Sequence, residues 1–166
     1  MLFAALALAA VEAPPPRPIT VEVVRDAITD SVSASATLLD AGQRLTLSCD
    51  RAEHYGVRVS FSSPHWMARG SFFSPERPIV YRFDSQRPRR HIWDVRDRGA
   101  ILAGRSRVGR FLHGLITAER LVIRARDVED HPFDLSFRIS GASAAVRELL
   151  EACGETRLRT RLYGPA

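Results

Sequence analysis

The sequence predicts an α+β domain: an antiparallel sheet built from hairpins, with two amphipathic helices packed on it and one disulfide. Short runs in which apolar and polar residues alternate recur along the chain, which is typical of half-buried strands. Two other segments show the helical period instead. A chain of 166 residues with 45% hydrophobic and 26% charged residues has the length and composition of one folded domain.

The alternating runs place the strands. They predict strands at 19–25, 44–49, 57–62, 77–84, 91–95, 121–126 and 133–139. Runs that follow each other across a turn predict three antiparallel hairpins. These are 44–49 with 57–62, 77–84 with 91–95, and 121–126 with 133–139. We assign no strand to the serine- and alanine-rich stretch at 30–37. The connection at 62–78 holds three prolines and is long enough to indicate a functional loop.

Two apolar stripes with helical spacing predict the helices. The first covers 106–116, where Gly109 and Gly114 lower the intrinsic helix propensity, so packing must supply most of the stability. The second covers 142–153, with Ser140 as its N-cap.

The first 13 residues form an apolar leader with features of a secretory signal. Its unbroken apolar run is shorter than the roughly 20 residues that a membrane-spanning helix needs, and small residues near its end fit a cleavage site, although the usual basic start is missing. We therefore expect a periplasmic or secreted protein with a leader at 1–13, a proline-rich linker at 14–18, one domain at 19–155 and a basic tail at 156–166. The alternative is a disordered apolar leader on a cytosolic protein. The tail is expected to be a short edge strand or a basic arm, and to be partly disordered, as most chain ends are.

The two cysteines give an independent test of export. Cys49 and Cys153 lie far apart and fit no CxxC spacing for a metal or redox site. An even count suits one structural disulfide, which is typical of exported proteins. Cys49 faces the core side of its strand and Cys153 the apolar side of the last helix, so a bond would fasten that helix to the first strands. Two buried free thiols are the alternative.

Several short motifs follow one another in a particular order between Leu45 and Gly154. They are Leu45-Thr46-Leu47-Ser48-Cys49, Val80-Tyr81-Arg82-Phe83-Asp84 followed by Trp93, Phe111-Leu112-His113-Gly114-Leu115 with Leu121-Val122-Ile123-Arg124, and Phe137 through Ser140-Gly141 to Cys153-Gly154. Their order and spacing resemble a group of small exported bacterial proteins that includes the type VI secretion-associated VasI and TagO proteins. The resemblance implies an exported α+β module with a disulfide and an accessory role in the cell envelope. It implies no catalytic residues.

The positive charge is concentrated in the middle of the chain. Thirteen arginines but only four acidic residues lie between Arg77 and Arg126, whereas the whole chain has a net charge of +5. We expect a non-enzymatic envelope module that attracts the acidic surface of a protein partner. The expected contact residues are Arg87, Arg89, Arg90, Arg105 and Arg107, with Trp66 and Phe72 from the long loop.

The same charge is also compatible with a surface that binds no protein. Every basic residue is arginine, so a compositional bias towards arginine on a solvated surface would also explain the positive charge. Anionic lipid headgroups or cell-wall polymers would also be attracted. Nucleic acid is disfavoured: the isoelectric point near 10.2 fits, but no recognition helix, zinc module or paired aromatic RNA-binding motif accompanies it.

The hairpin at 80–95 holds residues with an expected structural role. Arg82 and Asp84 lie two apart on one strand face, which predicts ion pairs with cross-strand neighbours, Asp94 among them. A carboxylate ligand gripped by Arg82 is the alternative. We expect Trp93 in the core rather than stacked on a ligand.

No motif for catalysis or cofactor binding stands out. The histidines show no HExxH pair and no Cys/His spacing for a metal, and the serines lack a G-x-S-x-G elbow. We therefore expect no cofactor, no metal and no enzyme activity. The rival hypothesis is a small cell-wall or glycan hydrolase with a site assembled in space from His65, His91, Asp94 and Asp97.

Overall fold

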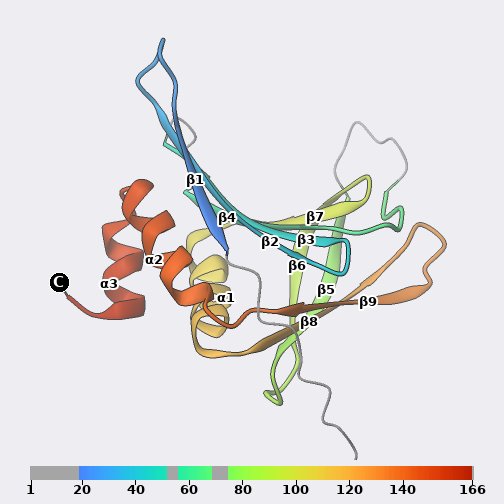
Figure 1. The fold of residues 1–166 in the computed structure, drawn as a ribbon. Coiled ribbons are helices and arrows are strands. Elements are labelled where there is room, and N and C mark those ends of the chain that lie inside the picture. The colour runs from blue at the N-terminus through green and yellow to red at the C-terminus, as the bar shows by residue number, and fades with distance from the viewer. Residues whose placement is uncertain (1–18, 52–55, 69–74, 166) are drawn as a thin grey trace, which may run out of the picture.

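An antiparallel sheet of nine strands with three helices packed on it makes up the described part of the chain, which confirms the α+β class (Figure 1). The computed structural model describes residues 19–51, 56–68 and 75–165; the expected leader and linker lie outside these ranges. The strands are β1 (Thr20–Arg25), β2 (Val32–Asp40), β3 (Gln43–Asp50), β4 (Val57–Ser62), β5 (Glu76–Phe83), β6 (Arg89–Arg96), β7 (Gly99–Leu102), β8 (Arg120–Arg126) and β9 (Pro132–Arg138). The helices are α1 (Arg105–Thr117), α2 (Ala142–Ala152) and α3 (Thr156–Tyr163).

The strands lie in the order β1-β2-β3-β4-β7-β6-β5-β8-β9. The three predicted hairpins are confirmed, since β3 pairs with β4, β5 with β6, and β8 with β9. The alternating runs did not predict β2 or β7. β2 alternates serine and threonine with buried alanines, and alanine has a weak strand preference, so its pattern is faint in the sequence. β7 has only four residues.

The sheet curls around α1 until its two ends approach each other (Figure 1). At the β2–β3 turn, the Asp40 carboxylate accepts a hydrogen bond from the backbone N–H of Arg138 at 2.9 Å. The side-chain oxygen of Gln43 accepts one from the backbone N–H of Ser136 at 3.0 Å. These bonds occupy donors that β9, as an edge strand, would otherwise offer to another strand. Side chains of the same chain therefore close this edge of the sheet.

An aromatic cluster joins α1 to the concave face of the sheet. The ring of Phe111 on α1 lies among those of Tyr81, Phe83 and Trp93, at centroid distances of 5.0, 5.3 and 5.8 Å. All four side chains are buried, and edge-to-face contacts of this kind add to the free energy that their burial supplies. We call the face of the sheet that α1 covers the inner face, and the opposite one the outer face.

The predicted first helix is confirmed as α1. Gly114 lies against Phe83, and a Cβ at this position would overlap the aromatic ring. The missing side chain therefore lets the helix approach the sheet closely. Packing, rather than intrinsic propensity, holds this glycine-containing helix in place.

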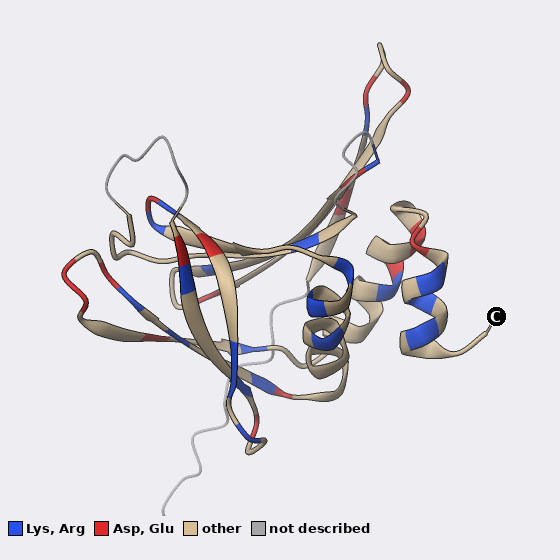
Figure 2. Cartoon of the chain, turned by 180° about the vertical axis from the view of Figure 1, so that it is seen from behind, with Lys and Arg blue, Asp and Glu red and all other residues tan. Residues whose placement is uncertain are grey.

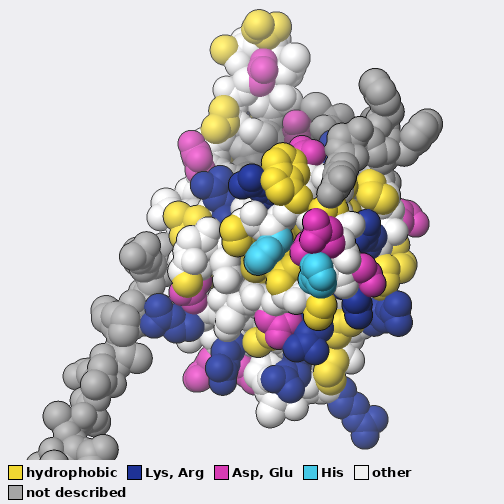
Figure 3. All heavy atoms as spheres, turned by 90° about the vertical axis from the view of Figure 1, so that its right-hand side faces the viewer, with side chains coloured by type: hydrophobic (Ala, Val, Ile, Leu, Met, Phe, Trp, Pro, Cys, Tyr) yellow, Lys and Arg dark blue, Asp and Glu magenta, His cyan; other side chains and the backbone are white. Residues whose placement is uncertain are grey.

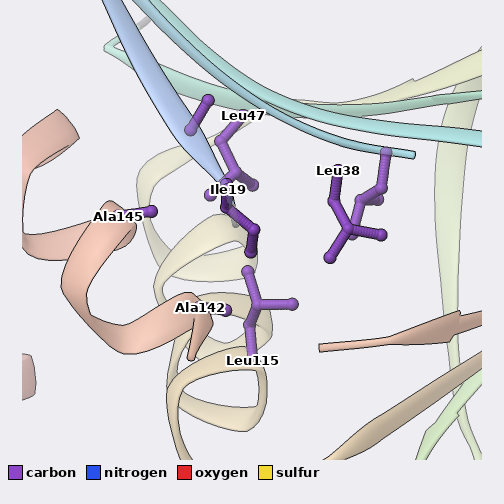
Figure 4. A pocket seen from close by; sticks show the side chains of 8 residues that line it. Ile19, Leu38, Leu47, Leu115, Ala142 and Ala145 are labelled. Carbon is purple, nitrogen blue, oxygen red and sulfur yellow. The ribbon is translucent and has the colours of Figure 1, made fainter. Parts of the chain in front are cut away.

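A small apolar hollow lies between the inner face of β2 and β3 and the helices α1 and α2 (Figure 4). The short side chains of Ala36, Ala142 and Ala145 leave this space. Ile19 points into it toward Leu115, and this contact packs the residue before β1 against the core.

The second helix and the disulfide are also confirmed. Cys153, directly after α2, is bonded to Cys49 on β3, with their Cα atoms 6.1 Å apart. The prediction of Ser140 as N-cap is wrong, because α2 begins after Gly141, which has a φ of 84° and makes no side-chain cap. Glycine adopts this left-handed conformation without steric cost, so the turn into the helix uses Gly141.

The tail is neither an edge strand nor a basic arm: it forms α3. Alternating leucine and arginine fit a strand, but Leu158 and Leu162 are also four apart, which is the spacing of one helical face. Leu158 is buried, and the Tyr163 hydroxyl donates a hydrogen bond to the carbonyl of Ser143 on α2 at 2.7 Å. Within the described ranges, no helix is both long and apolar enough to cross a membrane.

Replacing Gly114 by alanine is expected to destabilise the protein. The added methyl overlaps the buried Phe83 ring, and overpacking of this kind costs about 1–3 kcal/mol, more than the roughly 1 kcal/mol that alanine gains in helix propensity. Gly109→Ala is the matched control, because a Cβ there meets only the flexible end of Leu158, at 3.2 Å. Urea unfolding compares the two variants. A Gly114→Ala protein as stable as the control would contradict the packing argument.

Removing the disulfide through Cys49→Ala and Cys153→Ala is expected to lower the free energy of unfolding by about 4–5 kcal/mol in the chain-entropy account. The bond joins residues 104 positions apart, so it closes a long loop in the unfolded chain. Chemical unfolding measures the loss. Intact mass before and after reduction checks the bond itself, and equal masses would contradict it.

Candidate functional site

The structure divides the arginines of the β5–β6 hairpin between the two faces of the sheet. Arg89 lies opposite Tyr81 and therefore on the inner face, whereas Arg90 lies opposite Val80 on the outer face. Arg87 lies in the turn between the strands and is exposed. The expected contact residues of this hairpin thus do not form one continuous surface.

Tyr81 and His91 form a hydrogen-bonded pair at the inner-face end of the hairpin. The Tyr81 hydroxyl oxygen and His91 Nδ1 are 3.0 Å apart, and the tautomer decides which of them donates. Tyr81 is 1% exposed and belongs to the aromatic cluster, while His91 is half-buried. The imidazole therefore lies at the boundary between the aromatic core and solvent.

Helix α1 brings two further arginines to this pair. Arg107 and Arg110 are three residues apart, so they lie on neighbouring positions of the helix surface. Nη1 of Arg107 donates a hydrogen bond to the carbonyl oxygen of Ile92 at 3.3 Å, which joins the first turn of α1 to β6 next to His91. Figure 2 marks in blue the positions of basic residues along α1 and on the strands beside it.

The three arginines and the partial burial act together on the ionisation of the pair. Burial lowers the pKa of His91, and the positive charges of Arg110, Arg107 and Arg89 lower it further. Burial raises the pKa of Tyr81, while Arg89 and Arg110 oppose that change. Both groups are therefore held in the neutral form near neutral pH.

The three arginines have no counter-charge among the described residues. On β8 and β9, by contrast, Arg124 pairs with Asp134 at 2.7 Å and Arg126 with Asp130 at 3.0 Å. Within the described ranges no carboxylate lies within ion-pair distance of Arg89, Arg107 or Arg110. We call Tyr81, Arg89, His91, Arg107 and Arg110 the His91 cluster; it carries three positive charges and faces solvent on one side.

Sequence reasoning found only part of this cluster. Arg110 was missed, although it follows the predicted contact residue Arg107 by one helical turn. Tyr81 and His91 could have been placed together from the hairpin register. The approach of α1 to β6 could not, because it depends on contacts between residues far apart in the sequence. Arg105, the first residue of α1, is exposed and lies two residues before Arg107 in the helix.

Trp66 lies at the opposite end of β6 from the His91 cluster. Its ring is 49% exposed and is covered by the guanidinium of Arg98, whose Cζ is 4.4 Å from the ring centroid. The backbone N–H of Met67 bonds to the carbonyl of Asp97, which ties this loop to the β6–β7 turn. Since β6 has eight residues, the two ends lie on the order of 25 Å apart. Figure 3 views the molecule from the side of the β6–β7 turn, the right-hand side of Figure 1. Phe72 lies outside the described residues.

Neither Arg82 nor Asp84 forms the expected ion pair with a cross-strand neighbour among the described residues. Asp84 has a φ of 43° just after β5, and its carboxylate accepts hydrogen bonds from the backbone N–H groups of Glu119 and Arg120, the latter at 2.8 Å. Arg82 lies on the outer face opposite Val122. Asp84 therefore joins the end of β5 to the start of β8.

The four residues of the hydrolase hypothesis do not meet in one cleft. His91 lies on the inner face of β6, but Asp94 is three residues further along the strand and lies on the outer face. His65 stacks on Phe133, 4.5 Å between ring centroids, in the loop that contacts the turn of Asp97 at the far end. Among the described residues, no three His, Cys, Asp or Glu side chains are grouped so as to hold a metal ion.

Comparisons with known proteins assign no role to these residues. No family model, no curated protein and no solved structure matches this chain. The functional conclusion therefore comes from the arrangement of the side chains.

Acidification is expected to destabilise the fold through His91. Its pKa in the folded protein lies below the value of about 6.5 that the unfolded chain has. The unfolded state therefore takes up the proton first, and stability is lost as the pH falls from about 6.5 through the folded pKa. The carboxyls of Asp127 and Asp134, whose pKa is also lowered, titrate below this window.

Urea unfolding between about pH 7.5 and 5 measures this loss. Arg110→Gln removes one of the opposing charges, so it should raise the pKa of His91 in an NMR titration and reduce the loss of stability. An unchanged pKa in this variant would contradict the electrostatic coupling.

Proposed function

We propose that this protein is a non-enzymatic, exported module of the cell envelope that binds an acidic protein partner through the His91 cluster. The observation that carries the proposal is the convergence of three guanidinium groups from β6 and α1 around a half-buried histidine, with no carboxylate beside them in the described ranges. Arg87 and Arg105 are also exposed, whereas Arg90 lies on the outer face of the sheet, apart from the cluster.

An acidic surface is the partner that this chemistry fits. Guanidinium groups grip carboxylates with two parallel hydrogen bonds, and an excess of positive charge attracts such a surface over long range. The side of the cluster that faces solvent leaves the guanidinium groups of Arg89, Arg107 and Arg110 accessible to another molecule.

The disulfide supports export, because such bonds persist in oxidising compartments. A role beside a secretion apparatus rests on the resemblance to VasI and TagO and belongs to this proposal. The side chains named for the hydrolase hypothesis are spread over both faces and both ends of β6, which favours the non-enzymatic interpretation.

Reversing the charge of the cluster with Arg89→Glu and Arg107→Glu is expected to reduce partner recovery by at least about tenfold, because like charges across an interface cost several kcal/mol. The measurement is chemical crosslinking in the native envelope, followed by quantitative mass spectrometry of the captured proteins. The matched control is Arg157→Glu with Arg161→Glu on α3, which makes the same change in net charge on another exposed surface.

Equal recovery by the cluster variant and the control would contradict the proposal. Vesicles of anionic lipid provide the second arm. Wild-type protein that binds these vesicles, but crosslinks to no protein through the cluster, would assign the surface to lipid headgroups instead.

A further inference from the structure

His91 gives the cluster a second charge state, which its three arginines alone would not have. We propose that the His91 cluster binds a carboxylate of its partner together with one proton, which His91 takes up from solvent, so that binding strengthens as the pH falls. This inference rests on the proposed function and specifies the partner group and its regulation.

The groups that face the imidazole come from three elements. From β5, the Tyr81 hydroxyl oxygen lies 3.0 Å from Nδ1 of His91. Arg89 comes from β6, the same strand as His91, and Arg107 and Arg110 come from α1. None of these groups is an acid that is ionised near neutral pH. In the free protein, therefore, no negative charge in this set stabilises an imidazolium, and three positive charges oppose it.

A bound carboxylate reverses this balance. Its negative charge pairs with the guanidinium groups and so removes much of their repulsion on His91, and it attracts the imidazolium directly. After protonation both ring nitrogens carry a hydrogen, so Nε2–H can donate to the carboxylate while Nδ1–H donates to the Tyr81 oxygen. The anion and the proton thus each favour the binding of the other.

The hydrogen bond to Tyr81 survives this change. A phenol hydroxyl donates to a neutral Nδ1 that carries a lone pair, and its oxygen accepts from an Nδ1 that carries a proton. The contact between Tyr81 and Nδ1 is therefore kept, with its direction reversed, when the imidazole becomes charged. His113 and His131 are exposed, and Nδ1 of His131 lies 3.5 Å from the carboxylate of Asp127. We therefore assign proton uptake to His91, the histidine that faces the three arginines.

Thermodynamic linkage fixes the size of the effect. If the anion raises the pKa of His91, the affinity for the anion must rise on protonation by the same factor, which is tenfold for each pKa unit. The gain develops between the pKa of His91 in the complex and its lower pKa in the free protein.

The first experiment uses the wild-type protein with sulfate, an oxyanion whose charge stays constant between about pH 5 and 8. The NMR titration of His91 is compared in sodium sulfate and in sodium chloride of equal ionic strength. The pKa of His91 is expected to rise in sulfate more than those of His113 and His131. A rise no larger than theirs would overturn the inference.

The second experiment uses a peptide of four glutamates with both ends blocked, whose side chains stay ionised above about pH 5.5. Its affinity is expected to increase by up to about tenfold from about pH 7.5 to 5.5 for the wild type, if the peptide raises the pKa of His91 by about one unit. His91→Asn keeps a polar group for Tyr81 but cannot take up the proton, so the affinity of this variant for the peptide should not change over the same pH range. His113→Asn is the matched control and should behave as the wild type.

The outcomes separate the two proposals. Peptide that binds with the same pH dependence to His91→Asn and wild type overturns proton uptake but leaves the acidic-partner function standing. Peptide that fails to bind the wild type at either pH, together with unchanged crosslinking in the Arg89→Glu and Arg107→Glu variant, overturns the proposed function as well.

Discussion

The packing of α1 onto the inner face of the sheet is the contact on which the rest of the molecule depends. Phe111 lies among three aromatic rings of β5 and β6, and Gly114 lets the helix come close enough for this contact. The same contact decides where the polar side of the helix lies. Arg107 and Arg110 stand beside β6 because the buried side of α1 is fixed against that hairpin. Core packing thus holds like charges close together, an arrangement that their mutual repulsion alone would not maintain.

The parts of the fold that the sequence predicts are those with a strong local period. The hairpins β3–β4, β5–β6 and β8–β9 follow from alternation with branched and aromatic side chains, and α1 and α2 from apolar stripes. β2 lacks this signal, because alanine on its buried side contributes little hydrophobic contrast against serine. In α3 the signal is ambiguous: leucines at alternate positions also recur at the spacing of a helix, and the core contact of Leu158 decides between the two.

The candidate site was less accessible to sequence reasoning for two physical reasons. Arg89 and Arg90 are neighbours in the chain, but the pleat of a strand sends them to opposite faces, so a run of arginines does not make one surface. The remaining members come from α1, which is joined to β6 only by tertiary packing. Trp66 belongs to the same predicted set but lies beyond the other end of β6. A concentration of arginines in the sequence therefore indicates that a surface is positively charged, but it does not indicate which arginines lie together on it.

The two edges of the sheet are unlike, and this limits how copies of the chain can associate. Asp40 and Gln43 already occupy backbone donors of β9, whereas β1 pairs with β2 alone among the described strands. A sheet with two open edges can add copies without end and grow into a fibre. With one edge capped from within, pairing through β1 would use the one uncapped edge of the described sheet, and assembly by sheet extension would end at two molecules.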